Sequence, residues 1–170
     1  MKYMLALLLM FEVPLVLAEA RVRSGSVSFL AKGNPGFMKI EGKGPEGMRG
    51  VLDGQRGKFI FPLKNLETGI DLRDEHMKEK YLEVEKFPDA VLELLNAENL
   101  TGPGSDSSGS FRGRLTLHGV TKEVSGEYEF SGTKLIASFS IKLSDFGIDV
   151  PSWMGVTVAD IVDLKTDISF

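Results

Sequence analysis

Residues 162–170 read VDLKTDISF, and this stretch carries the pattern that decides the fold. Apolar or methyl-bearing side chains stand at every second position from Val162 to Phe170, with Asp, Lys and Ser between them. A period of two puts alternate side chains on opposite faces of a β-strand. This strand therefore has one apolar face, expected to be buried, and one polar face, expected to meet solvent.

The same alternation recurs upstream, which predicts a protein built almost entirely of strands. Ala90–Ala97 is apolar nearly throughout, and its short length and the nearby Pro88 favour a strand over a helix. With residues 162–170 this makes about eight strands, the others being residues 27–31, 37–43, 59–63, 111–117, 123–130 and 134–143.

Turn-forming residues separate these strands. Gly119 predicts a short corner, residues 131–133 (SGT) a hairpin turn, and the polar run 101–110 a mobile loop. The glycine-rich run 42–57 is interpreted as a long, twisted hairpin connection.

One segment departs from the period of two. Residues 73–84 (RDEHMKEKYLEV) place Met77 and Tyr81 four positions apart with charge elsewhere, which indicates a short amphipathic helix. Asp71 is expected to cap its N-terminus, and Phe87-Pro88 to end it.

The apolar faces of the strands must be buried against other parts of the protein, and one short helix is too small to bury them all. A second sheet or closure of the sheet on itself would bury them, so a sandwich and a barrel both satisfy the pattern. An eight-stranded barrel has an interior just wide enough to be filled by side chains or to hold one slender ligand.

Composition excludes several classes of protein. The chain has 170 residues, enough for one domain, and 20 Lys and Arg against 24 Asp and Glu give a net charge of −4. This balance provides no basic footprint for nucleic acid. The absence of Cys excludes disulfides, thiol catalysis and zinc–thiolate sites.

The first 20 residues are predicted to be a signal peptide. Lys2 precedes an apolar run that is too short to span a bilayer, and residues 18–20 (AEA) have the small-x-small form of a signal-peptidase site. Cleavage after Ala18 or Ala20 would leave one domain, about residues 21–170, in the periplasm or secreted.

Candidate catalytic groups are few. His76 lies in the predicted helix beside Asp71 and Glu75, where a solvated helix face is a simpler interpretation than a metal site. His118 is expected to hydrogen-bond backbone at the corner. No nucleophile elbow, phosphate loop or zinc-protease motif occurs in the sequence, so we assign no catalytic residue and no metal ligand.

Several short segments fall in order at compatible spacings along the chain. They are residues 25–29 (GSVSF), 68–71 (TGID), 73–77 (RDEHM), 81–82 (YL), 87–90 (FPDA), 111–122 (FRGRLTLHGVTK) and 145–148 (DFGI). Together they resemble the YceI-like family.

The resemblance implies an all-β fold, an eight-stranded antiparallel lipocalin-like barrel with one short helix at about residues 73–84. It also implies that the protein is not an enzyme but binds a long-chain isoprenoid, a quinone or another lipid inside the barrel, to sequester or carry it. A small periplasmic hydrolase using His76 or His118 and a ligand-free structural β-sandwich are the alternatives.

The lipid tail would contact inward-facing apolar side chains and two large residues between the last strands. These are Phe59, Phe61, Met77, Leu115, Leu117, Phe139, Ile141, Trp153 and Met154. Arg73 and His76 are the expected polar groups near the mouth. The expected partner is a lipid. We expect no cofactor, no nucleic acid and no stable membrane insertion after signal cleavage. The sequence does not decide whether the protein forms a homodimer.

Overall fold

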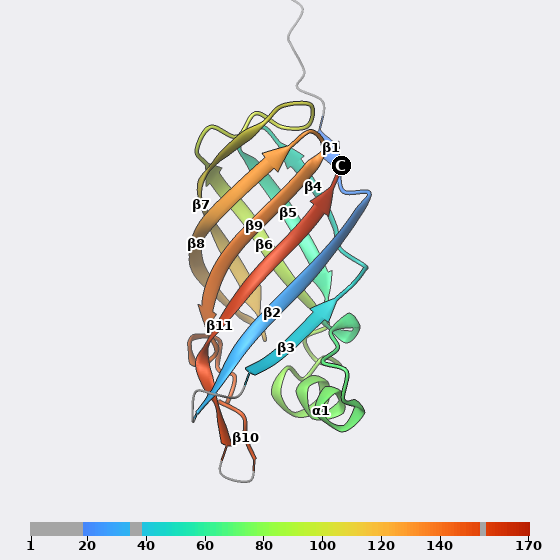
Figure 1. The fold of residues 1–170 in the computed structure, drawn as a ribbon, viewed down its shortest axis with the longest axis vertical. Coiled ribbons are helices and arrows are strands. Elements are labelled where there is room, and N and C mark those ends of the chain that lie inside the picture. The colour runs from blue at the N-terminus through green and yellow to red at the C-terminus, as the bar shows by residue number, and fades with distance from the viewer. Residues whose placement is uncertain (1–18, 35–38, 154–155) are drawn as a thin grey trace, which may run out of the picture.

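The computed structural model describes residues 19–34, 39–153 and 156–170, and one curled antiparallel sheet forms most of them (Figure 1). Neighbouring strands run in the order β1-β4-β5-β6-β7-β8-β9-β11-β2-β3, and β10 pairs with β11. The strands are Ala20–Arg21 (β1), Ser24–Asn34 (β2), Lys39–Gly44 (β3), Arg49–Asp53 (β4), Arg56–Pro62 (β5), Asp89–Ala97 (β6), Ser107–Leu117 (β7), Val120–Ser131 (β8), Lys134–Lys142 (β9), Ser152–Trp153 (β10) and Val156–Ser169 (β11). The helical segments are Leu63–Asn65 (η1), Asp71–His76 (α1), Met77–Tyr81 (η2) and Leu143–Phe146 (η3). The predicted all-β, lipocalin-like fold is confirmed.

The strand count differs from the prediction. The described residues form eleven strands, of which β1, β4 and β10 were not predicted. The interpretation of residues 42–57 as a hairpin connection is wrong, because Arg49–Asp53 forms β4 and pairs with β5 through a two-residue turn at Gly54 and Gln55. Gly54 has φ +56°, a conformation that glycine adopts without steric cost. The predicted loop 101–110 is also too long, because β7 begins at Ser107.

The helix is present but begins earlier than predicted and ends at Tyr81. Ile70 occupies the N-cap position, so the assignment of Asp71 as cap is wrong. No side chain of the described residues makes a capping hydrogen bond at this end; Asp74 Oδ1 instead accepts hydrogen bonds from the Thr68 backbone N–H (2.7 Å) and from the Thr68 hydroxyl, which join the helix to the segment before it. The second half, η2, winds as a π-helix.

Backbone hydrogen bonds close the curled sheet at two places. Between β1 and β2 the chain passes from one sheet edge to the other: Val22 N–H donates to Gly50 O (2.9 Å) on β4, and Arg23 N–H donates to Ser169 O (2.8 Å) on β11. Further round, Lys43 on β3 exchanges two backbone hydrogen bonds with Glu67, at 2.8 and 2.7 Å. We call this junction between β3 and Glu67 the seam. A side chain also packs there, because the Phe61 ring lies against the backbone of Gly44.

The two ends of the barrel differ in how they are filled. The chain terminates at one end of the barrel (Figure 1). At this end Phe130 is 1% exposed and stacks on Phe170 with ring centroids 5.7 Å apart, and Phe59 meets Phe170 edge-on at 6.5 Å. Leu100, in the loop after β6, is also buried there. The opposite end carries α1 and the β10–β11 hairpin (Figure 1). One end is therefore packed with aromatic rings, which leaves the other as the possible entrance.

The seam offers a test of this packing. Gly44 is buried, and a Cβ at this position would collide with the Phe61 ring. We expect Gly44→Val to destabilise the protein by about 1–3 kcal/mol, because overpacking forces side chains out of their preferred rotamers. Thermal unfolding followed by circular dichroism would show a midpoint lower by several degrees. Lys43→Val, on the exposed face of the same strand, is the control; an equal shift in both variants would contradict the explanation.

Candidate ligand-binding cavity

An apolar cavity of about 700 Å³ occupies the barrel between the packed aromatic end and α1. Inward-facing side chains from opposite walls of the barrel line it. Phe59 and Phe61 on β5 and Leu115 on β7 form one wall, and Phe29 on β2 and Leu164 on β11 form the other. Small-molecule pockets in proteins enclose roughly 300–1,000 Å³. The cavity therefore has the size and lining expected for an apolar ligand.

The structure brings most of the predicted site residues together around this cavity. Its lining includes Phe59, Phe61, Met77, Leu115, Leu117, Phe139 and Ile141, and also Arg73 and His76. Met154 and the side chain of Trp153 lie outside the described residues. Contact of these residues with a ligand stays a prediction.

The prediction omitted the wall formed by β2 and β11. Val27 and Phe29 line the cavity from β2, and Leu164 and Ile168 from β11. The alternation in residues 162–170 already marks the last two as inward-facing, so this wall could have been found from the sequence. Thr166, between them, is a buried polar residue that also lines the cavity.

Hydrogen bonds hold Arg73 at the mouth of the cavity. Its Nε donates to the Thr68 hydroxyl (2.7 Å) and its Nη2 donates to the Thr68 carbonyl oxygen (2.9 Å). Asp74 accepts hydrogen bonds from the same threonine. Thr68 therefore links the side chains of two helix residues, Arg73 and Asp74, to the segment that precedes the helix. The guanidinium is thus oriented before any ligand arrives.

His118 has a structural environment away from this cavity. Its Nε2 lies 2.7 Å from Glu83 Oε2 and its Nδ1 3.2 Å from the carbonyl oxygen of Phe146, while the Phe87 ring packs edge-on at 4.7 Å. Both ring nitrogens therefore have partners. His118 and Gly119 have φ +51° and +74° and form the two-residue turn between β7 and β8, which confirms the predicted corner.

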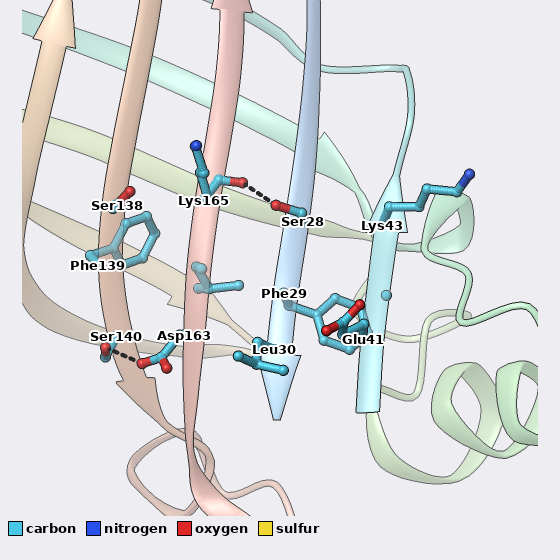
Figure 2. A pocket seen from close by; sticks show the side chains of 12 residues that line it. Ser28, Phe29, Leu30, Glu41, Lys43, Ser138, Phe139, Ser140, Asp163 and Lys165 are labelled. Carbon is cyan, nitrogen blue, oxygen red and sulfur yellow. Dashed lines mark hydrogen bonds between the residues drawn. The ribbon is translucent and has the colours of Figure 1, made fainter. Parts of the chain in front are cut away.

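A second hollow, also of about 700 Å³, lies over the outer face of β9, β11, β2 and β3. Figure 2 shows it between short serine side chains and longer charged ones. Ser140 Oγ donates to Asp163 Oδ1 (2.7 Å), and Ser28 Oγ contacts the carbonyl oxygen of Lys165 at 3.4 Å. Exposed acidic and basic side chains line this hollow, and such side chains are normally solvated by water. The interior cavity is therefore the better candidate for binding an apolar ligand.

Two acidic residues of β11 also have structural partners. Asp160 accepts hydrogen bonds from the Ser144 hydroxyl (2.6 Å) and backbone N–H (2.8 Å), and these hold the pKa of its carboxyl below the usual range. Neither Asp160 nor Asp163 lines the cavity. Among the described residues there is no cluster of His, Asp and Glu arranged to hold a metal ion. None of the helices described is long and apolar enough to cross a bilayer.

A small antiparallel barrel that is packed at one end and hollow at the other belongs to the lipocalin-like class of folds. The chain belongs to the YceI-like domain family, whose model matches residues 21–170. No curated protein matches the chain.

Solved structures share this fold at low sequence identity. A polyisoprenoid-binding domain from Saccharophagus degradans, implicated in plant cell wall breakdown, aligns with TM-score 0.68 and 16% identity, covering 89% of this chain and 97% of that domain. BcnA of Burkholderia cenocepacia aligns with TM-score 0.63 and 18% identity over 85% and 94% of the two chains. A Campylobacter jejuni YCEI protein gives 0.63 and 19% over 79% and 85%.

The cavity can be tested by narrowing it. Leu92 on β6 lines the cavity, whereas Leu95 on the same strand is 39% exposed and does not. We expect Leu92→Trp to weaken the binding of a fluorescent apolar probe such as 1-aminoanthracene about tenfold, because the indole ring occupies the space of the ligand. Leu95→Trp introduces the same ring outside the cavity and should bind the probe as the unsubstituted protein does. Equal loss in both variants, measured by fluorescence titration, would place the probe elsewhere.

Proposed function

We propose that this protein binds a long-chain isoprenoid or a related lipid in its barrel cavity, and that it sequesters or carries the lipid. The observation that carries the proposal is the apolar cavity of about 700 Å³, closed by aromatic rings at one end. Membership of the YceI-like family and the fold shared with a polyisoprenoid-binding domain support it.

The energetics of such a site favour the tail over the head group. Each methylene removed from water contributes about 0.8 kcal/mol, so a five-carbon isoprene unit contributes about 4 kcal/mol at most. Loss of rigid-body freedom and ordering of the tail offset part of this gain. A hydrogen bond to the head group adds only about 1 kcal/mol. Tail length should therefore set the affinity.

A hydrolase and a ligand-free sandwich are less well supported. Both ring nitrogens of His118 already have partners, and His76 lies at the mouth where no carboxylate lines the cavity in the described part of the chain. A sandwich would leave no room between its sheets, whereas this barrel encloses a cavity. Binding without catalysis is the function that the arrangement supports best.

Chain length of the ligand provides the test. We expect the affinity for prenyl alcohols to rise at least about tenfold with each added isoprene unit until the cavity is filled, because each unit buries more apolar surface. Native mass spectrometry of delipidated protein with a series of prenyl alcohols would measure this. Affinities that stay flat with chain length would refute a tail-driven site.

Export to the periplasm is part of the proposal and has its own test. Cleavage after Ala18 would leave β1 complete, whereas cleavage after Ala20 would remove one of its two residues, Ala20, which pairs with Leu52 on β4. We therefore expect the intact mass of exported protein to correspond to a chain that begins at Glu19. A mass that retains Met1 would contradict cleavage, and one that begins at Arg21 would contradict the role given to β1.

A further inference from the structure

The helix at the mouth separates its charges. Three of its four nitrogen-bearing side chains, Arg73, His76 and Lys80, line the cavity, and the fourth, Lys78, does not. Its acidic residues do not: Asp71, Asp74, Glu75 and Glu79 are absent from the lining. The helix therefore directs nitrogen-bearing groups from both α1 and η2 towards the cavity and keeps its acidic groups away from it.

The cationic groups at the mouth lack anionic partners. Among the described residues, no Asp or Glu lines the cavity, and neither Arg73 nor Lys80 makes an ion pair. Arg73 uses two of its five N–H donors on Thr68, which leaves three for a ligand. The Lys80 ammonium lies 5.4 Å from the centre of the Tyr81 ring, close to the rim.

We propose that the lipid bound here carries an anionic head group, such as a phosphate or carboxylate, which Arg73, His76 and Lys80 receive at the mouth. This inference rests on the proposed function, because the apolar cavity must first hold the tail. A charged group cannot enter the apolar interior without a large desolvation cost, so the head stays where water and cations meet it. The pre-oriented guanidinium suits the paired oxygens of a phosphate or carboxylate.

A pair of ligands with the same tail separates the head from the tail. Geranylgeranyl phosphate should bind at least about tenfold more tightly than geranylgeraniol at low salt, because only the phosphate gains from the cations. The difference should shrink in about 1 M salt, where the Debye length falls to about 3 Å. Inorganic phosphate alone should not compete with the prenyl phosphate, because it lacks the tail that supplies most of the affinity.

Variants of one charge identify the groups responsible. Lys80→Gln should reduce the affinity for geranylgeranyl phosphate about threefold or more, and by more than it reduces the affinity for geranylgeraniol. Lys78→Gln is the matched control, since it removes the same charge from the same helix at a position that does not line the cavity. Arg73→Gln should have the larger effect; because Arg73 also bonds Thr68, the thermal unfolding midpoint of this variant serves as the check on folding.

The outcomes separate this inference from the proposed function. Equal affinity for phosphate and alcohol, or an equal effect of Lys78→Gln and Lys80→Gln, would overturn the anionic head group while leaving the tail site in place. Competition by inorganic phosphate at comparable concentration would also overturn it, because the anion would then bind without a lipid. Binding of neither prenyl ligand would overturn the proposed function and this inference together.

Discussion

The packing of Phe59, Phe130 and Phe170 at one end of the barrel is the interaction on which the rest of the structure depends. A curled sheet with one apolar face has to fill its own interior, and here the aromatic rings fill only one end. Between this end and α1, inward side chains from the opposite walls line about 700 Å³ of space. Because apolar surface exposed to water is unfavourable, this unequal filling favours a ligand with a long apolar tail.

Alternation along the strands predicted the fold class and eight of the strands, but it is weak where glycine occupies inward positions, and it did not reveal β4. Gly42 and Gly44 on β3 face the interior without a side chain, and the rings of Phe29 and Phe61 lie against them. On β4, Gly50 likewise adjoins the Phe59 ring. A single sequence shows only the missing side chains, not the rings from neighbouring strands that fill the space. Asp53-Gly54, which leads into the turn at residues 54 and 55, was an available signal for the end of β4.

The candidate site was predictable in its residue types and not in its boundaries. Period-two alternation identifies Phe59, Phe111, Phe130 and Phe139 equally as inward-facing, yet Phe59 and Phe139 line the cavity and Phe111 and Phe130 do not. Position along the barrel axis decides between these outcomes, and it follows from strand register and closure. The role of Lys80 needed the same information, because a lysine in a charged helix looks solvent-exposed until the helix is placed against the mouth.

Placement of the helix links the tail site to the head site. Thr68 hydrogen-bonds to both Arg73 and Asp74. The threonine thereby orients the Arg73 guanidinium towards the cavity and donates hydrogen bonds to the Asp74 carboxylate, which does not line the cavity. A longer tail adds affinity in proportion to the apolar surface it buries, whereas a head group outside the barrel gains little from the same cavity. Selection among lipids with equal tails must then come from the rim. Since the rim presents nitrogen donors and no carboxylate from the described residues, its chemistry discriminates by the charge of the head group.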